Sequence, residues 1–149
     1  MSGMDRRMFL SAAMASGLVG LARTAGAAEP TAAEKVNVQI VNDFCAAWPN
    51  HDLDKLLGFF ADNGAYRMTE TMEPAKGRDA VSARIKTILN QVVRFEVLDT
   101  LARGPMVINE RIDRFSGGTL KSWHGVGVFF LKDGKIVEWY DYTIAMERT

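Results

Sequence analysis

Residues 120–146 read LKSWHGVGVFFLKDGKIVEWYDYTIAM, and this segment gives the clearest indication of the architecture. Asp133-Gly134 is a strong signal for a two-residue β-hairpin turn, because both residue types tolerate the positive φ angles that the turn requires. The flanking segments, about 120–131 and 136–146, are long and rich in Val, Phe, Trp and Tyr, which favour strands. We therefore predict two long antiparallel strands joined by a tight turn.

Two further segments of the same kind precede this hairpin, at about 92–102 and 106–115. Gly104-Pro105 divides them from each other, and Ser116-Gly117-Gly118 divides the second from the hairpin. Clusters of Gly, Pro and Ser mark turns rather than strands. The C-terminal half of the chain thus predicts an antiparallel meander of long strands.

The N-terminal half shows helical spacing of apolar residues instead. A first helix is predicted from Glu34 to Trp48, where Pro49 ends it. Asp52 is expected to cap a second helix whose apolar positions are Leu53, Leu56, Leu57 and Phe60. Asn63-Gly64 is expected to break the chain, followed by a strand over 65–71 and a third helix after Gly77.

Helices followed by an antiparallel meander define an α+β class. We expect the helices to pack on a strongly curved, mostly antiparallel sheet that leaves an apolar, conical pocket at its open end. The 149 residues suit one domain. We assign that domain to 28–149, because residues 1–27 resemble an export signal rather than a part of the fold.

The export signal is predicted from the order of its parts. Arg6-Arg7 is a twin-arginine pair, an apolar run follows to Leu21, and Ala25-Gly26-Ala27 supplies the small residues of a cleavage site. The apolar run is shorter than the about 20 residues that span a bilayer. We therefore expect a periplasmic or secreted protein, with no stable membrane insertion after cleavage.

Charge and cysteine content exclude some classes of function. The 18 basic and 18 acidic residues balance and are scattered along the chain, so no electrostatic footprint for nucleic acid exists. Cys45 is the only cysteine, which excludes an intrachain disulfide. It lies on an apolar helical stripe, where we expect a small buried hydrophobe rather than a nucleophile.

Three ionisable residues share strand faces with large apolar residues. Alternation places Arg111 and Asp113 beside Val107 and Phe115, and places Asp141 on the same face as Trp139. An unpaired buried charge costs several kcal/mol, so a purely structural core would not carry these residues. They are candidates for chemistry, although a paired cluster in which Arg111 merely neutralises both acids is the alternative.

A resemblance to a known family extends over nearly the whole of 28–149. The specific pieces are an Arg-x-Asp motif and a Trp-x-Asp motif, supported by several shorter matches in order and spacing. These residues resemble the limonene-1,2-epoxide hydrolases, within the wider NTF2-like or SnoaL-like superfamily: Phe59-Phe60-Ala61-Asp62, Tyr66, Gly77-Arg78-Asp79-Ala80-Val81, Glu110-Arg111-Ile112-Asp113, Gly125-Val126-Gly127-Val128-Phe129, Asp133-Gly134-Lys135-Ile136 and Trp139-Tyr140-Asp141-Tyr142.

The resemblance implies an NTF2-like cone and a one-step hydrolysis without metal or cofactor. Asp141 would be the general base, Asp113 the general acid, Arg111 the bridge between them, and Tyr66 a holder of the water. Where the family has an asparagine as a further water ligand, this chain has Met68. The substrate is expected to be a small lipophilic epoxide in a pocket lined by these residues: Met68, Trp139 and Phe115.

Two other functions remain open at this stage. One is an isomerase or cyclase of the ketosteroid-isomerase and polyketide-cyclase kind, with Asp141 as a carbon-acid base. The other is a non-catalytic module that binds a small apolar ligand. Alternation on the exposed strands is also compatible with a homodimer through the sheet, which is common in this superfamily.

Overall fold

The computed structural model describes residues 28–149, so the predicted export signal lies outside the described residues. Within this range no helix combines the length and apolar character needed to cross a membrane. The elements, in chain order, are α1 (Ala32–Ala47), η1 (Trp48–Asn50), α2 (Leu53–Leu57), β1 (Phe60–Arg67), β2 (Ala75–Lys76), α3 (Arg78–Leu89), β3 (Val92–Arg103), β4 (Met106–Phe115), β5 (Leu120–Lys132) and β6 (Lys135–Arg148).

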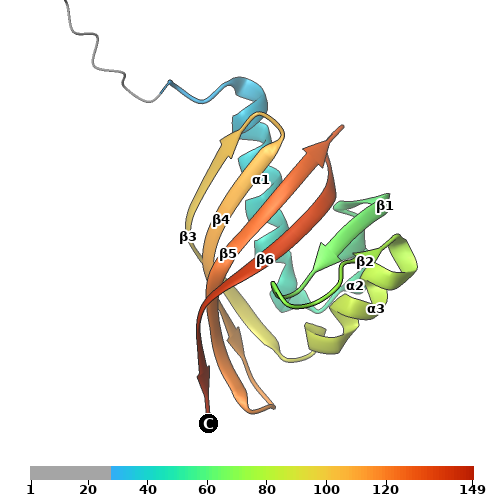
Figure 1. The fold of residues 1–149 in the computed structure, drawn as a ribbon, viewed down its shortest axis with the longest axis vertical. Coiled ribbons are helices and arrows are strands. Elements are labelled where there is room, and N and C mark those ends of the chain that lie inside the picture. The colour runs from blue at the N-terminus through green and yellow to red at the C-terminus, as the bar shows by residue number, and fades with distance from the viewer. Residues whose placement is uncertain (1–27) are drawn as a thin grey trace, which may run out of the picture.

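The expected α+β architecture is confirmed. Six strands form one sheet in the order β2-β1-β6-β5-β4-β3, which is not closed into a barrel. All pairings are antiparallel except that of β1 with β6, which is parallel. Figure 1 shows the long, curved strands β3 to β6 with α1 lying across them, and α2 and α3 beside β1. The last strand in the chain is therefore a central strand of the sheet.

Local chemistry sets the ends of the helices. α1 begins two residues before the predicted start, because Thr31 caps it: the Thr31 hydroxyl accepts from the Glu34 amide and the Glu34 carboxylate accepts from the Thr31 amide. Such a capping box satisfies two amides that lack helical partners. Asp52 caps α2 as predicted, but the helix ends at Leu57 and Phe60 belongs to β1.

The first strand differs from its prediction. β1 runs from Phe60 to Arg67 rather than over 65–71, and Asn63-Gly64 lies inside it instead of breaking the chain. The parallel register with β6 shifts between Phe60 and Ala65, so the irregular residues bulge out of the ladder. The short strand β2 was not predicted at all, since two residues carry no periodicity.

Two register shifts also change which side chains of β6 face the helices. Phe130 pairs with Glu138 but Leu131 pairs with Ile136, which leaves Val137 as an extra residue. Strict alternation put Ile136 on the opposite face from Trp139, yet both are fully buried. A second register shift, between Thr143 and Ala145, brings Met146 to the same face of the sheet as Asp141.

The core is an aromatic cluster between α1 and the sheet. Phe44 of α1 meets Trp139 edge to face, with ring centroids 5.1 Å apart. Trp139 in turn stacks on Phe129 of β5 at 5.5 Å and on Tyr66 of β1 at 3.9 Å. Aromatic pairs of this kind contribute about 0.5–1.5 kcal/mol each beyond their buried area. This rigid cluster fixes the strand positions that carry the candidate site.

Candidate active site

Arg111, Asp113 and Asp141 form one buried cluster across three strands. Nε of Arg111 donates to Oδ1 of Asp113 at 2.9 Å. Nη2 of Arg111 donates to both carboxylate oxygens of Asp141, at 3.0 and 3.1 Å. Arg111 and Asp113 lie on β4 and Asp141 on β6, so the guanidinium reaches across β5. All three side chains are almost fully buried, with Arg111 at 0% exposure.

Two glycines of β5 leave the space for this crossing. Gly127 pairs with Asp141 on one side and with Asn109 on the other, and Gly125 pairs with Arg111. A Cβ atom on Gly125 would lie 2.2 Å from the Trp123 ring. A Cβ atom on Gly127 would lie 3.1 Å from Oδ1 of Asp141, and nearer still to the guanidinium. Gly127 therefore leaves room for Arg111 and Asp141, and Gly125 leaves room for the Trp123 ring that lies over the guanidinium.

Aromatic rings enclose the guanidinium of Arg111. Its Cζ lies 4.9 Å from the ring centroid of Phe95, 5.0 Å from that of Trp123 and 5.4 Å from that of Trp139. Cation–π contacts stabilise a cation that has lost its water. Within residues 28–149 no hydrogen-bond acceptor contacts the buried Nη1 of Arg111. The cation is thus held by the two carboxylates and by rings.

Burial raises the pKa of both carboxyl groups. It raises the pKa of Asp113 to about 7 and that of Asp141 to about 6, against the lowering effect of Arg111 in both cases. Burial alone would lower the pKa of Arg111, but the two carboxylates more than offset this, so the guanidinium stays charged. One cation with one ionised and one protonated acid is electrically neutral, which is the state that a low dielectric favours.

The hydrogen bonds decide which acid keeps its charge. Asp141 accepts two bonds from Arg111 and a third, of 2.7 Å, from Nε1 of Trp139. Asp113 accepts one bond, from Nε of Arg111. Donors stabilise the ionised form, so the proton is held on Asp113. The two groups titrate as a coupled pair.

Tyr66 stands next to this pair on β1. It pairs with Trp139 in the parallel register and stacks on its ring with an interplanar angle of 9°. Burial, followed by the charge of Asp141, raises the pKa of Tyr66 well above its ordinary value. The phenol therefore stays protonated and can donate. Within the described residues its hydroxyl makes no side-chain hydrogen bond, which leaves it available to a bound water or ligand.

A pocket of about 180 Å³ opens onto these groups. Its lining includes three of the four predicted catalytic residues, Tyr66, Asp113 and Asp141, and the predicted pocket residues Met68 and Phe115. Apolar side chains supply most of the remaining wall: Ile88, Leu120, Trp123 and Met146. Arg111 lies behind the two acids and does not reach the pocket.

The prediction that Trp139 lines the pocket is wrong. Its ring lies between those of Tyr66 and Phe129, it is 0% exposed, and it is absent from the pocket wall. Its contribution is the indole N–H that Asp141 accepts. Alternation places Trp139 on the correct face, but it cannot show that Tyr66 comes between this ring and the pocket.

The loop after β1 carries two polar residues with different roles, Thr69 in the pocket wall and Glu70 in contact with β6. Thr69 lines the pocket beside Met68. Glu70 instead accepts from the amide and the hydroxyl of Thr143 at 3.3 and 3.2 Å. The Thr143 hydroxyl accepts from Nε1 of Trp123, whose ring covers the guanidinium of Arg111. Glu70 therefore holds the loop and the aromatic cover together, while Thr69 faces the cavity.

Sequence reasoning also missed a polar chain beneath the cluster. Asn109, fully buried and two residues before Arg111, donates to Thr100 at 2.8 Å and accepts from the thiol of Cys45 at 3.7 Å. Burial raises the pKa of Cys45 to about 12, so the thiol stays protonated, as expected of a buried hydrophobe. A polar residue on the same face as Arg111 was the available signal for Asn109.

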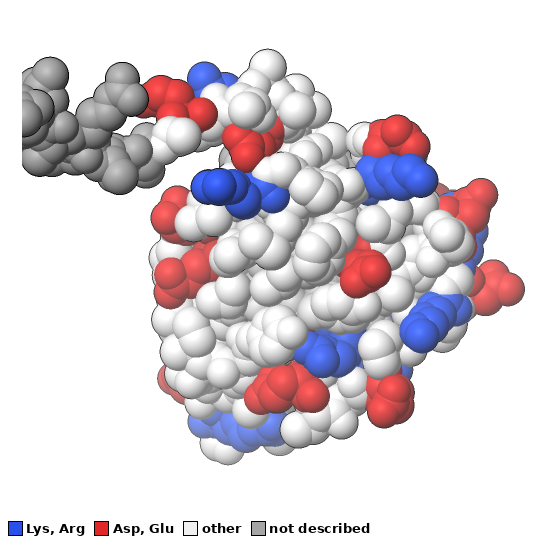
Figure 2. Space-filling view, turned by 45° about the horizontal axis from the view of Figure 1, so that its top comes forward, with Lys and Arg blue, Asp and Glu red and all other residues white. Residues whose placement is uncertain are grey.

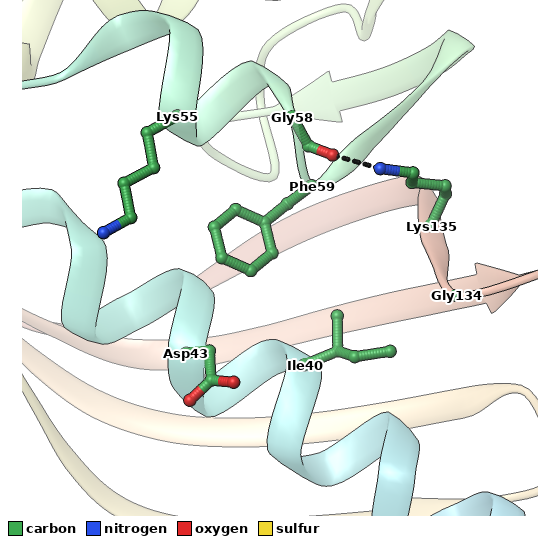
Figure 3. Close-up of a pocket in the computed structure, with 7 residues that line it drawn as sticks. All are labelled: Ile40, Asp43, Lys55, Gly58, Phe59, Gly134 and Lys135. Carbon is green, nitrogen blue, oxygen red and sulfur yellow. Dashed lines mark hydrogen bonds between the residues drawn. The ribbon is translucent and has the colours of Figure 1, made fainter.

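A larger hollow of about 400 Å³ lies elsewhere, between α1, α2 and the β5–β6 turn (Figure 3). Its charged residues are Asp43, Lys55 and Lys135, and Lys135 donates to the carbonyl of Gly58. It brings no two acids together. Figure 2 shows acidic and basic side chains interspersed over one face, without a continuous block of one sign. The small pocket beside Asp113 and Asp141 is therefore the candidate active site.

The fold and this pocket place the chain in the NTF2-like class of proteins. Residues 41–139 match the model of the SnoaL-like domain, and the chain belongs to that family.

Solved structures of similar fold include enzymes of several kinds. An LEH-like epoxide hydrolase from M. tuberculosis has a TM-score of 0.65 and 24% identity, over 74% of this chain and 84% of that one. SalBIII, an epoxide hydrolase/cyclase-like enzyme with a role in pyran ring formation in salinomycin, has a TM-score of 0.68 and 18% identity, over 73% and 91%. A protein from Kribbella flavida, proposed to be a ketosteroid isomerase, has a TM-score of 0.64 and 14% identity, over 78% of this chain and 83% of that one.

Proposed function

We propose that the protein hydrolyses a small lipophilic epoxide to a vicinal diol by one-step general acid–base catalysis. The observation that carries the proposal is the unequal sharing of Arg111 between two acids on one pocket wall. Asp141 accepts three hydrogen bonds, from Nη2 of Arg111 and Nε1 of Trp139, and Asp113 accepts one. Epoxide opening needs an ionised base for the water and a protonated acid for the leaving oxygen at the same time, and this arrangement supplies both.

The proposed step transfers two protons, forms one C–O bond and breaks another. Asp141 accepts a proton from a water held with the Tyr66 hydroxyl, and the water oxygen forms a bond to an epoxide carbon. The C–O bond of the ring breaks as Asp113 gives its proton to the leaving oxygen, which becomes the second hydroxyl. Asp141 ends protonated and Asp113 ionised, and proton exchange with solvent restores the pair. Arg111 stays charged throughout and limits the change in electrostatic energy.

An isomerase of the ketosteroid-isomerase kind is the second candidate. Met68 favours it, because this side chain stands on the pocket wall where the epoxide hydrolases resembled by the sequence have a water-binding asparagine. Against it, carbon-acid chemistry needs no cation between the base and the acid. The two proposals differ in their products, since only the hydrolase incorporates an atom from water.

Diol formation from cyclic and aliphatic epoxides in ¹⁸O-labelled water, with EDTA present, tests the proposal. Wild type should give singly labelled diol. Asp141→Asn should lose about a hundredfold to ten-thousandfold in rate, the range that general acid–base groups contribute. Asp62→Asn is the matched control, because its side chain is 97% exposed and lines neither this pocket nor the larger hollow. Equal rates in Asp141→Asn and wild type, or folded wild type without turnover of any epoxide, would contradict the proposal.

A further inference from the structure

A β-bulge turns the end of β6 into the pocket. His124 pairs with Ala145 and Gly125 with Thr143, so Ile144 is an extra residue in β6. Strict alternation from Asp141 would put Met146 and Arg148 on the opposite face of the sheet. The bulge reverses the alternation, and both side chains line the same pocket as Asp141. Bulges beside active sites commonly redirect side chains in this way.

Arg148 is the one cationic side chain in the wall of this pocket, as far as residues 28–149 are described. It is exposed, whereas Asp113 and Asp141 are buried, so it stands on the solvent side of the cavity. Within the same range it forms no salt bridge, and its side chain donates only to the sulfur of Met146, at 3.8 Å. A thioether is a weak acceptor, so the guanidinium keeps its capacity to bind an anion.

We infer that the substrate is a small epoxide that carries a carboxylate, with Arg148 as the residue that binds this group. The inference rests on the proposed hydrolysis and names its substrate class. The charge of Asp141 repels an anionic substrate, and a guanidinium at the solvent side offsets this repulsion and orients the molecule. Arginine suits the task because its planar fork matches a carboxylate in two parallel hydrogen bonds.

The cavity limits the size of the molecule. A volume of about 180 Å³ is below that of pockets for drug-sized ligands, which measure about 300–1,000 Å³. Most of the rest of its wall is apolar, with Met68, Phe115 and Leu120 among its residues. The expected substrate is therefore a compact ring or short chain, with the epoxide at the buried end and the carboxylate at the exposed end.

The test compares the epoxide of cyclohexenecarboxylic acid with that of its primary amide, which has the same size and no charge. Wild type should prefer the acid by about tenfold in kcat/KM, and added KCl should reduce this preference. Arg148→Gln should remove the preference by raising KM for the acid about tenfold and KM for the amide much less, with the effect on KM rather than on kcat because the contact is made equally before and during reaction. Arg148→Lys should retain part of it. Lys121→Gln, an exposed cation outside the pocket wall, is the matched control and should behave as wild type.

Equal use of acid and amide by wild type, or a preference that survives in Arg148→Gln, overturns the inference while leaving hydrolysis intact. If folded wild type turns over neither of these epoxides nor any cyclic or aliphatic epoxide of the first test, the proposed function fails, and binding then decides the inference separately. Trp123 lies in the pocket wall, so its fluorescence reports occupancy by cyclohexanecarboxylic acid or its amide. Tighter binding of the acid in wild type but not in Arg148→Gln supports the carboxylate site; equal binding refutes it.

Discussion

A Cβ atom on Gly127 would stand 2.6 Å from Nη1 of Arg111, so the guanidinium occupies the volume that any other residue at position 127 needs. The same hypothetical atom would lie 2.7 Å from the ring of Phe129. The residue type at position 127 of β5 is therefore restricted by Arg111 of β4 and by the contact of Arg111 with Asp141 of β6.

Gly127→Ala should therefore displace Arg111 from Asp141. We expect a loss of about 1–3 kcal/mol in the free energy of unfolding, the usual cost of overpacking, and at least about a hundredfold loss of hydrolysis. Urea denaturation and diol formation measure the two effects. In an Arg111→Ala background, where the guanidinium is gone, Gly127→Ala should cost less stability; an undiminished cost would place the clash elsewhere.

The pH–rate profile should be bell-shaped. Burial raises the pKa of Asp141 to about 6 and that of Asp113 to about 7, and the reaction needs the first ionised and the second protonated. kcat/KM should fall below about pH 6 as Asp141 gains its proton, and above about pH 7 as Asp113 loses its own. The residual activity of Asp113→Asn should lack the alkaline limb. A rate that rises steadily to pH 9 would exclude Asp113 as the acid.

Asp113→Asn should also change how stability depends on pH. The pKa of Asp113 is raised in the folded protein from an ordinary 3.8 to about 7, so the folded state holds this proton more tightly than the unfolded state. The resulting stabilisation is present at low pH and is lost as the pH rises through 7. Asparagine does not titrate. The variant should therefore gain on the order of 2 kcal/mol relative to wild type between pH 5 and pH 8.

Chemical denaturation at the two pH values checks this gain, with Asp62→Asn as a control that should show none, since its side chain is 97% exposed. A variant whose difference from wild type is the same at both values would show that Asp113 does not change its protonation between pH 5 and pH 8 in the folded protein.

Met68→Asn should accelerate hydrolysis. Met68 lines the pocket near Tyr66 and Asp141, and an amide there can hold the attacking water that a thioether holds poorly. One further hydrogen bond contributes about 0.5–1.5 kcal/mol, which corresponds to a gain of up to about tenfold in kcat. Steady-state kinetics on a neutral epoxide measures it. Met146→Asn, also in the pocket wall, is the control; an equal gain there would indicate a general effect of pocket polarity.

The sequence predicts the sheet better than the site. Strands 92–102, 106–115 and 120–131 lie close to β3, β4 and β5, because long alternating runs between Gly-rich turns have few other solutions. Arg111, Asp113 and Asp141 are conspicuous because they are charges among apolar residues. In β6, alternation fails at Val137 and Ile144, since a bulge depends on pairing with β5 and leaves no signal in one strand.

Contacts between distant segments are the other part that one sequence does not reveal. The stack of Tyr66 on Trp139 follows from the parallel pairing of β1 with β6, and no local pattern specifies that pairing. For the same reason the polar chain through Asn109 and the role of Trp139 as a donor to Asp141 became visible only in the structure.

The central position of β6 determines when the sheet can form during folding. This strand comes last of the six in chain order, yet it lies between β1 and β5, and its absence leaves both without their shared neighbour. The sheet is therefore divided into two parts, β2-β1 and β5-β4-β3, until β6 joins them, and strand pairings between segments this distant in sequence form slowly. Asp141 arrives with β6. The cluster of Arg111, Asp113 and Asp141 is thus assembled only when β6 joins the sheet, and a chain shortened before β6 should lose the proposed activity entirely.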